Sequence, residues 1–338
     1  LLTRKRVFAG LTALLFAVQP GYAEAVAWVA ATSDLLLALW YLLALWMHLL
    51  FLRGRGVRFY AISLAAFAIC LLTHESSATL LPMMIALEVT VVWERGDRVR
   101  GSTSSRRADS AGGLAGRALR YAPFALLLAG YLALEYVVNS RSYLVTEGHY
   151  QFGWHAVPHA LQYLITLYVG RRDAVSYVLT AAVIAVLLLR GTPPVRFLVL
   201  WMLVTIAPAS FFTWGNVSRY LYLPAAGFAM LLAEAILTVR NLVAERVSPR
   251  GARAAAIALT AVLGVRFAVF AAKVPAGFRE WTRPYERYVA AIRKANPAPS
   301  PGSVVYVDRA DARGVPATYR DPAGAVASCG ADIHVVVR

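Results

Sequence analysis

Charged residues are scarce in this chain of 338 residues, and acidic residues are scarcer than basic ones. Asp, Glu, Lys and Arg make up 15% of the sequence, against about 25% in an average soluble domain. Hydrophobic residues make up 59%. A soluble fold of this composition would leave much of its apolar surface without a core to enter. The composition therefore indicates an integral membrane protein.

Cysteine is almost absent, and the usual cofactor motifs are missing. The two cysteines, Cys70 in an apolar run and Cys329 near the C-terminus, stand in no metal-ligand spacing, so neither a disulfide framework nor a zinc site is implied. The sequence has no phosphate-binding glycine loop and no nucleophile elbow, which argues against nucleotide-driven chemistry. We predict no cofactor and no metal site, while a requirement for a divalent metal ion stays open.

The excess of basic residues follows the hydrophobic pattern. The 34 Lys and Arg against 18 Asp and Glu give a net charge of +16, and the arginines fall between apolar runs rather than on one amphipathic face. Membrane topology explains this distribution better than nucleic-acid binding, because cytoplasmic loops retain Lys and Arg. We expect membrane lipids as partners and no nucleic acid.

Apolar segments recur about nine times, and several are short for a full crossing, which needs about 20 residues. They cover 6–19, 35–52, 57–73, 77–93, 121–138, 174–190, 195–213, 219–239 and 254–273. Alternate loops between them carry the arginines, which places those loops in the cytoplasm. The sequence thus predicts an all-α polytopic membrane protein with a cytoplasmic N-terminus and an extracytoplasmic C-terminus.

Two parts are expected along the chain. Residues 1–275 form the transmembrane helical domain, with a flexible cytoplasmic linker at about 94–120 and an outer loop at about 139–173. Within that loop, 154–168 predicts either an amphipathic helix on the membrane surface or a plain connecting helix. Residues 276–338 form an extracytoplasmic helix and a small β-containing tail, with strands expected at 303–307 and 333–337.

Three acidic residues near the predicted outer ends of helices, Glu24, Asp34 and Glu75, are candidates for catalysis. Carboxylates at membrane depth are costly and are mostly retained for function. Each also has a structural interpretation. Glu24 would be solvated at the surface, Asp34 would cap a helix that begins at Leu35, and Glu75 would pair with His74 to close a turn.

Arg219, followed by Tyr220 and Tyr222, is the strongest local signal. A guanidinium is a planar, permanently charged fork that suits phosphate, and tyrosine rings offer a stacking surface for a sugar. A phospholipid headgroup and a polyprenyl phosphate fit equally well. The structural alternative is an aromatic belt with an anchoring arginine. We predict that Arg219, Tyr220, Tyr222 and His74 bind the substrate or its phosphate.

At these residues the chain resembles bacterial membrane glycosyltransferases with the GT-C fold, which include relatives of the transmembrane-and-TPR O-mannosyltransferases. Their signature F-A-x-H-P, E-A-V-A-W and R-x-D-L-L is similar to residues 16–36, their K-E turn to 73–76, and their R-Y-L-Y-L-P to 219–224. An exit helix is matched at 281–297. The chain has Gln19 where the family has His, and His74 where it has Lys.

The resemblance implies an enzyme of the bacterial inner membrane with a GT-C-like bundle. Such an enzyme moves a sugar from a polyprenyl-phosphate-linked donor to a glycan or protein acceptor on the extracytoplasmic side. A carboxylate would take the acceptor proton while Arg219 balances the departing phosphate. The family's catalytic acid lies between its first two spans, and this chain aligns from the third. We therefore expect an N-terminally incomplete chain, with the catalytic base unidentified.

Two other functions stay open. A transporter or flippase for a lipid-linked sugar would show internal repeats and helices broken at mid-membrane, and the sequence has no convincing repeat. A polysaccharide polymerase or ligase would place its chemistry in a large outer loop, and the loop at 139–173 is modest. The transferase is the function that the sequence favours.

Overall fold

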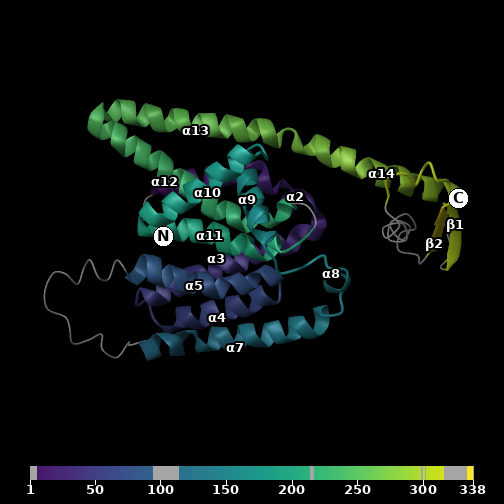
Figure 1. Ribbon diagram of the computed structural model, residues 1–338, viewed down its shortest axis with the longest axis horizontal. Coiled ribbons are helices and arrows are strands. Elements are labelled where there is room, and N and C mark those ends of the chain that lie inside the picture. The colour runs from purple at the N-terminus through teal and green to yellow at the C-terminus, as the bar shows by residue number, and fades with distance from the viewer. Residues whose placement is uncertain are drawn as a thin grey trace. The chain divides into compact units, whose positions relative to one another are not determined.

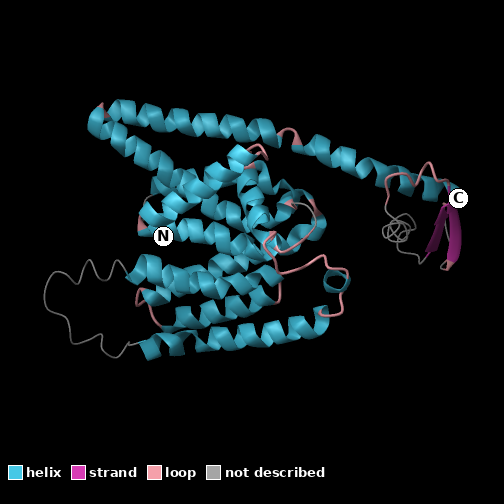
Figure 2. Ribbon diagram, in the orientation of Figure 1, coloured by secondary structure: helices cyan, strands magenta, loops and turns pink. Residues whose placement is uncertain are grey.

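The computed structural model describes residues 6–93, 114–213, 217–297, 300, 302–315 and 333–337, most of which are helical (Figures 1 and 2). The chain divides into two units, Leu1–Phe270 and Ala271–Arg338. The predicted linker at 94–120 lies outside the described residues as far as 113. Its last residues are not linker, because α7 begins at Leu114.

The first unit holds the apolar helices. From the N-terminus to the undescribed segment they are α1 (Arg6–Val18), η1 (Pro20–Tyr22), α2 (Ala23–Ala27), η2 (Val29–Ala31), α3 (Thr32–Leu52), α4 (Val57–Leu71), η3 (Glu75–Thr79), α5 (Leu80–Leu87) and the π-helix η4 (Glu88–Trp93). After it come α7 (Leu114–Asn139), α8 (Tyr143–Thr146), α9 (Ala156–Leu167), α10 (Ala174–Arg190), α11 (Pro193–Ser210), η6 (Ser218–Leu221), α12 (Tyr222–Arg246) and α13 (Pro249–Ala271).

Five helical segments of the described chain are long and apolar enough to cross a membrane: α3, α7 from Ala118, α11, η6 with α12, and α13. The protein is therefore an all-α, multi-pass membrane protein. Each of the nine predicted apolar segments contains a helix. Nine crossings remain a prediction, because α1, α4 and α10 are 17 residues or shorter, at or below the usual lower limit for a span, and the segment at 77–93 is divided among η3, the eight-residue α5 and η4.

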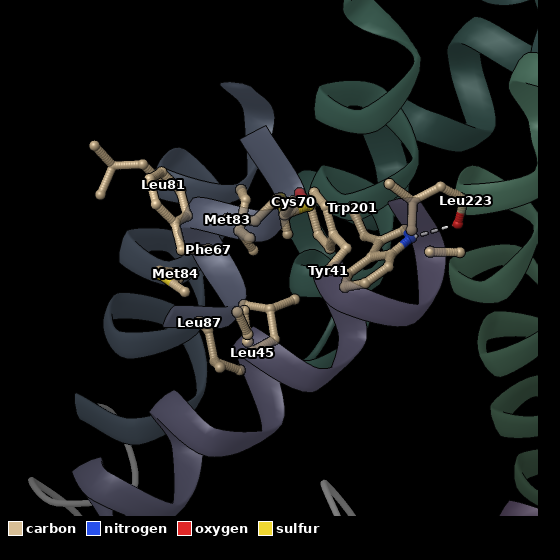
Figure 3. Packing of buried hydrophobic residues seen from close by; sticks show 14 of the residues in the cluster. Tyr41, Leu45, Phe67, Cys70, Leu81, Met83, Met84, Leu87, Trp201 and Leu223 are labelled. Atoms are coloured by element: carbon tan, nitrogen blue, oxygen red, sulfur yellow. Dashed lines mark hydrogen bonds between the residues drawn. The ribbon is translucent and has the colours of Figure 1, made fainter. Parts of the chain in front are cut away.

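The largest cluster of buried hydrophobic residues in the described chain lies among α3, α4, α5 and α11, and it reaches α7 and α12 (Figure 3). Trp201 of α11 meets Tyr41 of α3 edge to face, with ring centroids 5.5 Å apart. The indole N–H of Trp201 donates to the Leu223 carbonyl at 2.9 Å. Gly227 allows this approach, since a Cβ there would lie 2.4 Å from Trp201 Cδ1. A missing side chain on α12 thus creates the room for the indole.

Ionisable side chains inside the bundle form a hydrogen-bonded network around Glu88. Glu88 accepts hydrogen bonds from Arg120 at 3.0 Å and from Tyr121 at 2.5 Å. The Tyr121 hydroxyl also lies 3.2 Å from Nε2 of the fully buried His48. A charge in a membrane is expensive unless it is paired, so this network satisfies Glu88 within the protein.

The helix of the predicted outer loop packs into the bundle. α9 buries Leu164 and Leu167 against Val199 and Ile206 of α11. The apolar side that predicted a membrane-surface helix consists of Trp154, Leu161, Leu164, Ile165 and Tyr168, and of these Leu164 and Ile165 are buried in the protein. Trp154, assigned to the same apolar side, precedes the helix and is 91% exposed.

The second unit contains α14 (Val274–Ala295) and two strands, β1 (Ser303–Val307) and β2 (Ile333–Val337). The strands pair in parallel, with Ser303 opposite Ile333 and Val307 opposite Val337. One side of α14 packs on β1 through Tyr288 and Ile292. In the first unit Cys70 is a free, buried thiol, whereas Cys329 lies outside the described residues.

Candidate functional site

Five polar residues predicted from the sequence, Glu24, Asp34, His74, Glu75 and Arg219, form one connected cluster. Glu24 lies in α2, Asp34 in the first turn of α3, and His74 and Glu75 in the turn between α4 and α5. Arg219 lies in η6. Contacts of α2 with α3 and η6, and of α11 with η3 and η6, bring these elements together. The fold therefore unites residues that are up to 195 positions apart.

Glu24 fixes the start of η6. Its Oε2 accepts hydrogen bonds from the Ser218 hydroxyl at 2.9 Å and from the Arg219 amide at 3.3 Å. Its Oε1 lies 3.8 Å from the Arg219 guanidinium. A carboxylate at the start of a helix satisfies N–H groups that have no partner inside the helix. Glu24 is thus a partner of Arg219 and not a solvated surface residue, since its side chain is only 20% exposed.

The Arg219 guanidinium lies against two aromatic rings. It is 4.8 Å from the centroid of Trp28 and 5.0 Å from that of Tyr220, and it donates to the Tyr220 hydroxyl at 3.2 Å. Tyr220 in turn stacks on Phe212, with centroids 5.7 Å apart and planes 5° from parallel. The rings orient the guanidinium, and 24% of the Arg219 side chain remains exposed.

His74 lies between two carboxylates. Its Nε2 is 3.6 Å from Asp34 Oδ1, and its Nδ1 is 3.3 Å from Glu75 Oε2. The Ser76 amide donates to Nδ1 at 3.1 Å, which orients the ring as the N-cap of η3. Its ring centroid is also 6.4 Å from that of Tyr220, which connects this half of the cluster to Arg219.

Asp34 is not a helix cap, contrary to the structural interpretation of its sequence position. α3 begins at Thr32, three residues before Leu35, where the cap role required it to begin, and Ala31 occupies the cap position. The Asp34 carboxylate is instead buried inside the first turn, with 6% of its side chain exposed, and faces His74. Its burial is explained by this contact.

Exposure separates the three carboxylates. The Glu24 carboxylate already accepts hydrogen bonds from η6, and Asp34 is buried. By contrast, 49% of the Glu75 side chain is exposed. A general base must reach the proton that it removes. Glu75 is therefore the carboxylate best placed to accept a proton from a molecule bound at this cluster.

Tyr222 lies apart from the cluster. Its ring packs edge to face on Tyr22 and Phe16, with centroids 5.0 Å and 5.4 Å away. Tyr220 and Tyr222 are two residues apart and so do not share a face in a helical segment. The geometry thus gives Tyr222 a place in the packing between α12 and the α1–η1 segment, while Tyr220 contacts Arg219.

Sequence reasoning missed three aromatic residues of the site: Trp28, Phe212 and Tyr163. Trp28 belongs to the E-A-V-A-W match, so the motif itself could have identified it as a site residue. No motif in the sequence includes Phe212. The Tyr163 hydroxyl accepts a hydrogen bond from the Val217 amide at 3.3 Å next to η6, and burial raises the pKa of Tyr163 to about 12. Its role is to hold the start of η6 from the side of α9.

Comparison of the chain with models of protein families, with curated proteins and with solved structures returns no match. The resemblance to GT-C enzymes therefore depends on the motif residues alone. Among the described residues, no group of three or more His, Cys, Asp or Glu side chains is arranged to hold a metal ion.

Proposed function

We propose that this protein is a membrane glycosyltransferase of the bacterial inner membrane. It would move a sugar from a polyprenyl-phosphate-linked donor to a glycan or protein acceptor on the extracytoplasmic side. The observation that supports this most is that the Tyr220 ring connects Arg219 with the His74–Glu75 pair in one cluster at the ends of membrane helices. Such a cluster can act on a lipid headgroup while the lipid tail stays in the bilayer.

Each group has a distinct task in this proposal. Arg219 binds the phosphate of the donor and stabilises the negative charge that grows on it as the sugar leaves. Glu75 takes the proton of the acceptor hydroxyl as the new bond to the sugar carbon forms. Tyr220 and Trp28 orient the guanidinium, and the exposed part of Trp28 offers a ring to the sugar. Asp34 positions His74 from the buried side.

The cluster carries more negative than positive side chains, since it contains three carboxylates, of which Glu24 contacts the one guanidinium. A phosphate is attracted only where it lies closer to Arg219 than to the carboxylates, because Coulomb energy falls with distance. The donor phosphate can therefore bind only on the side of the cluster where the guanidinium lies. Phosphate binding should also be lost when the charge of Arg219 is removed.

The test is release of polyprenyl phosphate from a panel of polyprenyl-phosphate sugars by the purified protein in liposomes. This readout does not require the acceptor to be known if membrane extract supplies it. We expect Arg219→Gln to lower the release rate about 100-fold or more, the effect of losing one charge-stabilising donor. Glu75→Gln should lower it about 100-fold, as expected for a missing general base.

Two control variants remove a charge at a position far from the cluster, on α12, the helix that follows η6. Arg240→Gln and Glu245→Gln alter α12 near its other end, so release should stay within about twofold of the wild type if only the cluster matters. Full activity in both Arg219→Gln and Glu75→Gln would contradict the proposal. Movement of intact donor across the bilayer without release would favour the transporter instead.

A further inference from the structure

A second site lies between α9, α10, α11 and α12, where an apolar cavity of about 320 Å³ opens. Its volume falls in the range of small-molecule sites, roughly 300 to 1,000 Å³. None of the residues of the cluster around Arg219 lines it. The walls are hydrocarbon side chains such as Leu167, Val183 and Phe228. Within the lining, Thr180 and Tyr168 bond to each other at 2.9 Å, so their hydroxyls need no water. A cavity of this kind suits a hydrocarbon chain.

The Tyr168 end of this cavity is cationic. The Arg266 guanidinium of α13 donates to the carbonyls of Tyr168 and Val169, at 3.4 Å and 2.8 Å. Arg171 and Arg172 follow directly in the chain, and the Arg171 side chain is 93% exposed. Asp173 lies 3.8 Å from Arg171 and offsets one charge. Three guanidinium groups against one carboxylate leave positive charge beside the cavity.

A strained turn holds these arginines where they are. The Gly170 amide donates to Ile165 and the Val169 amide to Thr166, which closes the C-terminus of α9 as a Schellman turn. The residue in the left-handed position is normally glycine, but here it is Val169, with φ of 56°. A β-branched residue adopts this conformation only where the surroundings impose it. Arg266 supplies part of that constraint by binding the carbonyl of Val169.

We infer that this cavity binds an anionic phospholipid of the bilayer. One acyl chain occupies the space between α9, α10, α11 and α12, and the phosphate lies at Arg171, Arg172 and Arg266. Arginine binds phosphate through paired N–H donors, and basic residues at a membrane surface attract anionic headgroups. A zwitterionic lipid has no net charge to match this rim. The site requires no sugar donor and is independent of the transferase proposal.

The experiment counts lipids that stay bound to the purified full chain. Protein is equilibrated with an equal mixture of phosphatidylglycerol and phosphatidylcholine, transferred to lipid-free detergent, and measured by native mass spectrometry. We expect retention of phosphatidylglycerol in preference to phosphatidylcholine. The double variant Arg171→Gln/Arg172→Gln should weaken retention about 20-fold or more, since each charge near a membrane surface contributes about fivefold.

Matched variants separate this site from general lipid contact. Val183→Trp fills the cavity from its open side, and Val186→Trp puts the same ring elsewhere on α10. The two valines are 54% and 56% exposed, so both variants should fold. Only Val183→Trp should abolish retention. Arg250→Gln/Arg253→Gln removes two charges at the opposite end of α13 and should retain the lipid.

Three results would overturn the inference. One is equal retention of the two lipids by the wild type. Another is equal behaviour of the two tryptophan variants. A third is displacement of the lipid by inorganic phosphate alone, with no preference for long over short acyl chains, because that result would describe a phosphate site without a role for the cavity.

Discussion

The contact between α11 and α12 gives the sharpest test of how the bundle packs. Replacing Gly227 by alanine would put a Cβ 2.4 Å from Cδ1 and 2.9 Å from Cγ of Trp201. Ordinary contacts need about 3.5 Å or more, so the indole must move by about 1 Å. Trp201 has little room to do so, because it is 2% exposed and its N–H is bonded to Leu223.

The expected cost combines two effects. Overpacking a filled core costs about 1 to 3 kcal/mol, and weakening the Trp201 hydrogen bond adds about 1 kcal/mol. We therefore expect Gly227→Ala to destabilise the protein by about 2 to 4 kcal/mol. For a unit of this size that corresponds to a fall of about 5 to 10 °C in the melting temperature. Thermal unfolding in detergent, followed by near-ultraviolet circular dichroism, would measure it.

Gly264→Ala is the matched control. Gly264 also lies inside a membrane helix, α13, but a Cβ there would meet no atom within 4 Å. Alanine has the higher helix propensity, so this variant should be neutral or more stable by up to about 1 kcal/mol. Equal melting temperatures for the two variants would refute the packing of α11 against α12 described above.

Three further predictions concern other parts of the first unit. Val169→Gly should raise stability by about 1 kcal/mol, because glycine removes the strain of the left-handed position; an unchanged melting temperature would argue against that conformation. Glu88→Gln should cost about 2 to 3 kcal/mol by leaving the charge of Arg120 without its carboxylate, whereas full stability in thermal melts would contradict the pair. Burial raises the pKa of Tyr163 from its ordinary value of 10 to about 12, so folding favours the neutral phenol, and its contribution of up to about 3 kcal/mol is present below pH 10 and is lost as the pH rises to 12. Tyr163→Phe should therefore lose stability less steeply than the wild type between pH 10 and 12, as unfolding midpoints across that range would reveal.

The sequence by itself determined where helices form and that they belong in a membrane. Every predicted apolar segment contains a helix, because 20 apolar residues in lipid must satisfy their own backbone hydrogen bonds. It also identified Arg219 and the acidic residues, since a charge among apolar helices stands out in any composition. These inferences need only local information.

Only the tertiary structure decided which side of each helix is buried. The apolar stretches of α3 and α13 have almost the same mean hydropathy, yet 44% of one and 6% of the other is buried. A membrane helix is apolar all round, so its sequence has no polar face to mark the side that packs. The geometry of the site also depends on which side of each helix is buried. Glu24 reaches Arg219 and Tyr222 turns away because of how α2, α11 and α12 pack, and no pattern along the chain encodes that packing.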